Sequence, residues 1–157
     1  MKTEQQLTAL FDQETSSLQQ LWDVLQEEHT ALTGTDIEAV ERATSNKNRA
    51  LANQANATSA RIKYAAQSGA GESTEEMQQL IASFSNSDEL AGSFSTLVSL
   101  AKECHQANRN NGRLIVEKQQ QAALALDVLR QVDSNLATYS GQGRAVSKSA
   151  TRSLGKA

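Results

Sequence analysis

The sequence predicts an all-α protein: an elongated antiparallel bundle or coiled coil of three long helices and one short helix, followed by a disordered C-terminal tail. Apolar residues recur at alternating steps of three and four along three long segments, which is the spacing of one helix face. The 157 residues include no proline, where average usage would supply about eight. Aromatic residues make up only 4% of the chain, whose commonest residues include alanine, leucine, glutamine and glutamate.

The first predicted helix spans residues 4–32. Gly34 is a natural C-terminal stop, and Thr35 followed by Glu38 matches a capping box that restarts the chain as a second helix. So short a connection implies an antiparallel helical hairpin. The heptad seam of the first helix is apolar except for two glutamates that fill its gaps: Leu7, Phe11, Glu14, Leu18, Leu21, Leu25, Glu28 and Leu32.

The second predicted helix spans residues 36–66 and has a thin, alanine-rich apolar face, which should pack closely but weakly. The segment 67–73 reads as a loop, and Ser73 with Glu76 forms a second capping box that opens a short helix over 74–84. The predicted seam of the second helix is Ile37, Val40, Thr44, Lys47, Leu51, Thr58 and Ile62.

The longest predicted helix spans residues 88–138. A helix of about 50 residues measures about 75 Å, against about 45 Å for each arm of the hairpin. One end should therefore project, or show an apolar face that the chain itself does not cover. Its predicted seam is Leu90, Phe94, Leu97, Ala101, Cys104, Asn108, Asn111, Ile115, Lys118, Ala122, Ala125, Leu129, Val132 and Leu136.

We expect one helical domain over residues 1–139 and a flexible basic tail over 140–157, with Tyr139, Gly141 and Gly143 marking the helix end. The tail carries four basic residues and no acidic one, so its charge is +4 and the preceding 139 residues carry −7, which together give the chain's −3. Such a segment is predicted to be disordered by itself.

The stretch "NRNNGRLI", residues 108–115, is unusual for the middle of a helix, because asparagine and glycine are poor helix formers. Asn108 and Asn111 both fall on the seam. Two interpretations stay open: a buried polar layer that fixes the register of the bundle, or a site where a partner's helix docks. Gly112 beside them lets another backbone come close, or lets the helix bend.

Composition and charge narrow the function classes. The net charge of −3 argues against a general nucleic-acid binder. The single cysteine, Cys104, excludes an internal disulfide and fits a reducing compartment. No stretch approaches 18 apolar residues and the chain begins without an apolar leader, so we expect a soluble, cytoplasmic protein with no stable membrane insertion.

Candidate catalytic groups are sparse, and we expect no enzyme. Cys104 and His105 are adjacent, so they point about 100° apart around a helix and cannot form a nucleophile–base pair by themselves. His29 and His105 would make a poor metal site without further ligands. A histidine phosphotransfer bundle is disfavoured, because "HQANRN" lacks the lysine–glycine pair that such proteins place after their histidine.

Four features, in this order, resemble the FlgN family of flagellar export chaperones. "LQQLWDVLQEEHTAL", residues 18–32, resembles its N-terminal "LxxLLxxE"-like helix. The run Asp36, Glu38, Ala39, Val40 and Lys47 resembles its "D-x-E-A-(apolar)…K" segment. Asn108, Asn111 and Gly112 match an "N…NG" element of its long C-terminal helix. "ALALDVLRQVDSNLATYSGQG", residues 123–143, resembles its closing alanine/leucine run and "Y-G-x-x-G" residues.

The resemblance implies a cytoplasmic chaperone of the flagellar type III export system that uses no cofactor, nucleotide or metal. Its implied partners are the C-terminal helices of the hook-associated proteins FlgK and FlgL, the export apparatus, and a second copy when unloaded. We expect Tyr139, Gly143 and Arg144 to dock on the export apparatus. The alternative is a coiled-coil scaffold or adaptor with no export role. The expected partner-binding residues are Asn108, Asn111, Gly112, Leu114, Ile115, Ala122, Leu126 and Leu129.

Overall fold

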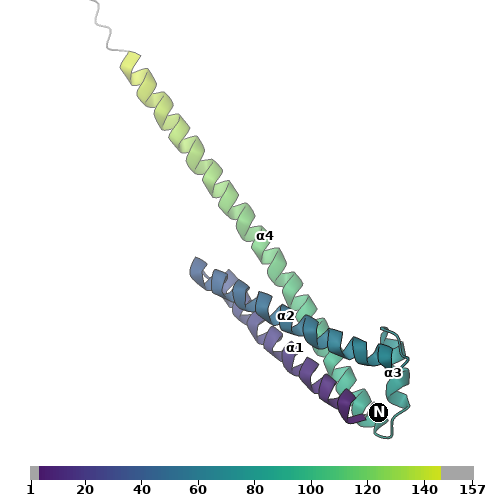
Figure 1. The fold of residues 1–157 in the computed structure, drawn as a ribbon. Coiled ribbons are helices and arrows are strands. Elements are labelled where there is room, and N and C mark those ends of the chain that lie inside the picture. Colours follow the sequence, from purple (N-terminus) through teal and green to yellow (C-terminus); the bar gives the residue numbers. More distant parts are fainter. Residues whose placement is uncertain (1–3, 146–157) are drawn as a thin grey trace, which may run out of the picture. The chain divides into compact units, whose positions relative to one another are not determined.

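The computed structural model describes residues 4–145, and side chains through Tyr139. Within these residues four helices follow one another: α1 (Glu4–Thr33), α2 (Ile37–Gln67), α3 (Thr74–Ala82) and α4 (Ser87–Ala145) (Figure 1). No strand occurs between residues 4 and 145, so the predicted all-α class of three long helices and one short helix is confirmed. The predicted tail lies mostly outside the described residues.

The chain divides into two compact units, Met1–Ile115 and Val116–Ala157. The first holds α1, α2, α3 and the N-terminal part of α4, and the second holds the rest of α4. The first unit ends where the last half-buried side chains of α4, Leu114 and Ile115, lie. The predicted division at residue 139, between a helical domain and a tail, stays a prediction.

The helix ends are set by side-chain and backbone caps. Asp36, not Thr35, caps α2: its Oδ1 accepts a hydrogen bond from the Ala39 amide at 3.2 Å, so the predicted Thr35–Glu38 capping box is wrong. Aspartate is as good an N-cap residue as threonine. Asp36 stands directly before the first residue of α2, one position closer than Thr35. The Ser73–Glu76 capping box is present at the start of α3, as predicted.

The C-terminus of α2 closes in a Schellman motif. The Ala70 amide donates to the Ala65 carbonyl, and the Gly69 amide donates to the Ala66 carbonyl. Gly69 has a φ of 79°, a left-handed conformation that glycine adopts without steric cost. The chain thereby turns away from α2 and into the loop that leads to α3.

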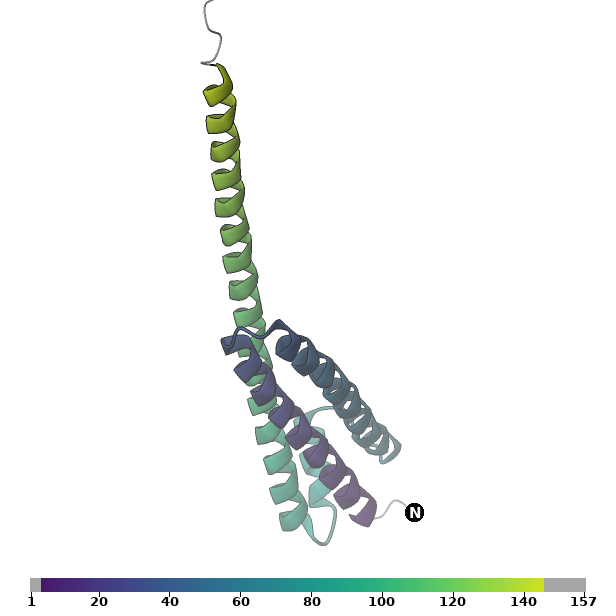
Figure 2. The ribbon, with the colours of Figure 1, turned by 90° about the vertical axis from the view of Figure 1, so that its left-hand side faces the viewer.

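Helix α1 contacts both α2 and the first part of α4. All eight side chains of its predicted seam are buried. Hydrogen-bonded pairs show that it runs antiparallel to α2, since Glu28 meets Lys47 and Glu14 meets Arg61. It runs parallel to the first part of α4, since the Leu18 carbonyl meets Cys104 and the Leu25 carbonyl meets Asn111 (Figure 2).

Helix α2 turns inward a face that only partly matches its predicted seam. Its buried side chains lie mainly seven residues apart, at Ala43, Ala50, Ala57 and Tyr64, while the predicted seam residue Ile37 is 75% exposed. Leu51, also on the predicted seam, is exposed as well. Thr44, Lys47 and Thr58 of the predicted seam do meet α1, through hydrogen bonds to its glutamates, and the buried alanines lie beside them.

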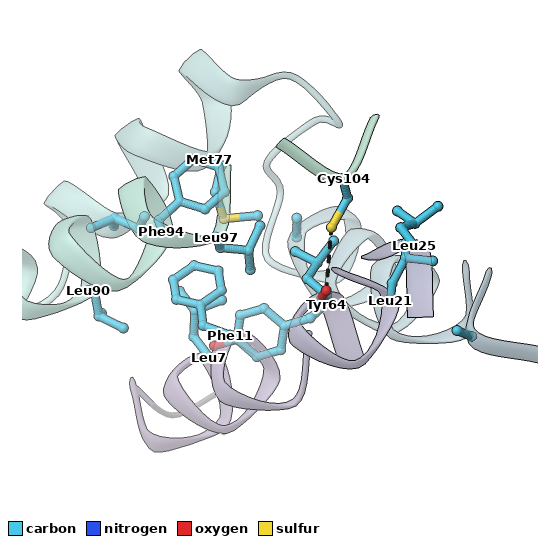
Figure 3. Close-up of a cluster of buried hydrophobic side chains, with 14 residues drawn as sticks. Leu7, Phe11, Leu21, Leu25, Tyr64, Met77, Leu90, Phe94, Leu97 and Cys104 are labelled. Atoms are coloured by element: carbon cyan, nitrogen blue, oxygen red, sulfur yellow. Dashed lines mark hydrogen bonds between the residues drawn. The ribbon is translucent and has the colours of Figure 1, made fainter. Parts of the chain in front are cut away.

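The hydrophobic core is richest where α1, α3 and α4 meet (Figure 3). The rings of Phe11 and Phe94 stack with centroids 5.4 Å apart. Met77 and Ile81 of α3 are buried against the same cluster. The short helix α3 therefore forms part of the core of the first unit. A stacked aromatic pair such as Phe11 and Phe94 adds about 0.5–1.5 kcal/mol beyond the effect of its buried area.

Helix α4 does not end near residue 138 as predicted but continues to Ala145. It passes through Gly141 and Gly143, which were expected to stop it. Glycine in a helix costs only about 1 kcal/mol, whereas proline costs about 3, and the chain contains no proline. Glycine at the end of a periodic segment is thus too weak a helix breaker to end α4 here.

Candidate partner-binding surface

A buried carboxylate organises one polar layer inside the first unit. Glu28 is fully buried, and its Oε1 accepts hydrogen bonds from Lys47 Nζ at 2.7 Å and from Thr44 Oγ1 at 3.5 Å. Its Oε2 accepts from Asn111 Nδ2 at 3.0 Å. We call Glu28, Thr44, Lys47 and Asn111 the Glu28 layer. Its charge is paired and its oxygens are satisfied, which is what a buried carboxylate requires.

Asn111 closes this layer from α4. Its side chain is 1% exposed, and Nδ2 also donates to the Leu25 carbonyl at 2.9 Å. Oδ1 lies 3.3 Å from Nδ1 of His29. The structure thus places Asn111 in the register-setting role, since only one axial position of α4 lets it meet Leu25 and Glu28 together. Its expected contact with a partner stays a prediction.

A second layer repeats this arrangement two heptads away. Glu14 accepts hydrogen bonds from Thr58 Oγ1 at 2.8 Å and from the Arg61 guanidinium. The offset is 14 residues on both helices, from Glu28 to Glu14 on α1 and from Lys47 to Arg61 on α2. From α4, Phe94 supplies a ring centroid 5.8 Å from Cζ of Arg61. Glu14 and Glu28, the two glutamates within the predicted apolar seam of α1, are therefore the residues that form the ion pairs between α1 and α2.

The other expected residues of the first unit differ in burial. Asn108, Leu114 and Ile115 are half-buried. Gly112 is exposed, and a Cβ added to it would meet nothing within 4 Å. No neighbouring backbone within the described residues accounts for this glycine, so the close approach predicted from it is not found there.

The second unit carries the largest exposed apolar surface of the described chain. Every side chain from Val116 to Tyr139 is exposed. We call the apolar positions on one side of this segment the apolar stripe. The apolar stripe consists of Ala122, Ala125, Leu126, Val128, Leu129, Val132, Leu136 and Tyr139.

The apolar stripe is continuous along one side of α4. At 100° per residue, its flanking members Leu126 and Val128 lie about 160° apart around the helix, and the others fall between them. Among its large apolar members, exposed fractions run from 49% at Val132 to 80% at Tyr139. Isolated exposed leucines are ordinary, but a contiguous apolar patch marks an interaction surface.

Sequence reasoning found part of this stripe and missed the rest. Ala122, Leu126 and Leu129 were expected to bind a partner and do lie on the apolar stripe. Val128 was not singled out, because it lies off the heptad seam that was followed through α4. Reading the segment at 3.6 residues per turn would have found it. Leu124, also missed, is 66% exposed and adjoins the stripe.

Cys104 belongs to the core. Its Sγ donates to the Leu18 carbonyl at 3.4 Å. Burial, with a smaller contribution from the negative charge of Glu103, raises the pKa of the Cys104 thiol to about 11. A thiol held protonated in this way is a poor nucleophile. Across residues 4–145, no group of three His, Cys, Asp or Glu side chains is placed to hold a metal ion.

The positions expected to meet the export apparatus lie at the end of α4. Tyr139 is 80% exposed. Gly143 and Arg144 belong to the last turn of the helix. Their expected docking role stays a prediction.

An all-helical bundle with satisfied polar layers, joined in sequence to an exposed amphipathic helix, is typical of proteins that recognise helices of a partner. The FlgN protein family matches residues 1–147. The chain belongs to this family, the flagellar export chaperones. Searches of curated proteins and of solved structures each found no match. Within residues 4–145, no helix combines the length and apolar character needed to cross a membrane.

Proposed function

We propose that this chaperone acts in the cytoplasm on the hook-associated proteins FlgK and FlgL. It covers their C-terminal helices, prevents premature assembly and delivers them to the flagellar export gate. Family membership supports the general role of an export chaperone. The single observation that carries the choice of site is the apolar stripe, which the described chain leaves exposed.

The apolar stripe suits capture of a helix. Apolar side chains at three- and four-residue intervals are the pattern by which an amphipathic helix recognises another apolar face. Burying one leucine contributes roughly 1.5–3 kcal/mol, so a few stripe residues are enough to drive association. No catalytic step, nucleotide or metal enters this function, and we propose that the protein is not an enzyme.

Replacing Leu126 and Leu129 with aspartate should abolish binding of C-terminal fragments of FlgK and FlgL. The double variant introduces two charges into the surface that is buried on binding, and each charge would lose its solvation there. Titration calorimetry with both fragments measures the effect and also shows which cargo is preferred.

Gln131→Asp/Ser134→Asp is the matched control, because it adds the same two charges at the same spacing on the polar side of α4. It should bind with unchanged affinity. If L126D/L129D remains helical and binds normally, the site lies elsewhere, with α1 the next surface to test.

A coiled-coil scaffold with no export role is the competing function. Secretion assays separate the two, because a chaperone variant that cannot bind cargo should reduce export of FlgK and FlgL and impair motility. Normal secretion by cells that lack the protein would favour the scaffold. Substituting Tyr139 with alanine should lower export without lowering cargo affinity if this end of α4 docks on the export apparatus.

A further inference from the structure

The apolar stripe changes width along its length. Its central seam, Ala122, Ala125, Leu129, Val132 and Leu136, keeps the alternating steps of three and four. Between residues 122 and 129, both positions that flank this seam are also apolar, Leu126 on one side and Val128 on the other, with exposed fractions of 54% and 59%.

One heptad later, the flanking positions are Asp133 and Asn135, and only the seam itself remains apolar. The apolar stripe is therefore wide near residues 122–129 and narrow from Val132 onward. A narrow seam of two positions per heptad is what a single partner helix covers in a coiled coil. A helix that also carries apolar residues on both flanks of this seam packs against more than one neighbouring helix.

The seam in the wide part begins with two alanines, Ala122 and Ala125, before it reaches Leu129, and larger side chains stand at both edges beside these alanines. A single helix seated on Ala122 and Ala125 would reach only part of Leu126 and of Val128. Two helices, one resting on each edge, would bury both. The opposite side of α4 stays in water in this arrangement, as its exposed Arg130–Asp127 ion pair at 3.8 Å requires.

From these observations we propose that the segment 122–129 of α4 binds two helices of one cargo molecule, one on the Leu126 edge and one on the Val128 edge. The result is a local three-helix assembly. The proposal rests on the proposed function for its cargo and goes beyond it in naming the kind of ligand, a pair of helices rather than a single one.

A second copy of this chain is a less suitable occupant. In a parallel pair it would supply one helix only. It would also bring Lys118 opposite its own counterpart, since Lys118 lies on the same seam seven residues before Ala125. Like charges that face each other across a helical seam oppose pairing.

Photo-crosslinking of the full chain in complex with full-length FlgK or FlgL tests this directly. The crosslinking residue p-benzoylphenylalanine replaces Leu126 in one variant and Val128 in another, and Ser134 on the polar side in the control. We expect products from positions 126 and 128 to map to two different helical segments of one cargo molecule, and position 134 to give little product. Mass spectrometry locates the crosslinks.

A second measurement uses the unmodified chain and so does not depend on how the variants fold. A cargo fragment that holds both segments should bind at least about tenfold more tightly than a fragment that holds either one, which corresponds to 1.4 kcal/mol. Crosslinks from both edges to the same segment, crosslinks to a second copy of the chaperone, or equal affinity of the one- and two-segment fragments would overturn the two-helix inference alone. If the unmodified chain forms no complex with either cargo, the proposed function fails first and the inference with it.

Discussion

Asn111 shows at the scale of one residue why a helix retains a poor helix former. Its amide joins α4 to the Leu25 carbonyl and to the buried carboxylate of Glu28. An aliphatic side chain at this position would leave both acceptors without that donor, and an unsatisfied buried polar group costs roughly 1–3 kcal/mol. The loss of helix propensity at asparagine is smaller than this cost.

Substituting Asn111 with alanine should lower the free energy of unfolding by about 1–3 kcal/mol. Urea unfolding followed by circular dichroism measures the change. Asn110→Ala is the matched control, because it brings the same gain in helix propensity at an exposed position whose only described bond is to the Gln106 side chain. Equal stability of the two variants would contradict the register role of Asn111.

Lys47 neutralises a carboxylate that has no access to water. Replacing Lys47 with methionine keeps the length of the side chain but leaves Glu28 without its cation, and removing one partner of a buried pair costs roughly 3–5 kcal/mol. We expect a loss at the lower end of that range, because Thr44 and Asn111 still donate to Glu28.

The control for this variant is Lys63→Met, at an exposed position of the same helix. It should change the free energy of unfolding by less than about 0.5 kcal/mol. A second variant that combines Lys47→Met with Glu28→Gln should recover part of the lost stability. If Lys47→Met and Lys63→Met unfold at the same urea concentration, the ion pair in the Glu28 layer is not a stabilising contact.

At the scale of the element, α1 was the most predictable helix and α2 the least. The seam of α1 combines large apolar residues with glutamates at fixed heptad positions, so one face alone satisfies the pattern. Helix α2 offers Ile37 and Leu51 on one face and alanines on the next. Its orientation depends on where Glu14 and Glu28 meet their cations, which is a tertiary contact that periodicity does not contain.

The candidate site was predictable in part for a similar reason. A helix longer than its neighbours implied an uncovered apolar face, and Leu126 and Leu129 were found in this way. Asn111 lay between two interpretations because sequence spacing places it on the seam without identifying its hydrogen-bond partners. Those partners, Leu25 and Glu28, come from a segment more than 80 residues earlier in the chain.

Gly112 weakens α4 at a place where the first unit does not require a glycine. Since a Cβ there meets open space, Gly112→Ala should raise the free energy of unfolding by about 0.5–1 kcal/mol. Gly92→Ala is the matched control, because Gly92 is exposed in the same helix and equally open. Thermal unfolding of both variants measures the gain.

Gly112 belongs to the "N…NG" element that resembles the FlgN family, which predicts a role in partner binding. If Gly112 has this role, the alanine variant at position 112 should also lose cargo affinity. The variant at position 92 should not. A destabilised Gly112→Ala protein would contradict this account, because it would show that the helix itself needs glycine at that position.

At the scale of the whole molecule, the two units differ in where their apolar side chains go. The unit ending at Ile115 buries its large apolar residues and satisfies Glu14, Glu28 and Asn111 within its own helices. The unit that begins at Val116 exposes the side chains of its described residues through Tyr139. An apolar face without internal cover is suited to a partner that supplies the cover, and this is the basis of the chaperone function proposed above.

Hydrogen–deuterium exchange of the full chain, with and without a C-terminal fragment of FlgK or FlgL, tests the central claim that the apolar stripe receives cargo. The account predicts that cargo slows exchange of backbone amides within residues 122–139 and leaves those of the buried seam of α1 unchanged. Protection confined to α1 and α2, with residues 122–139 exchanging as fast as in the free protein, would contradict it.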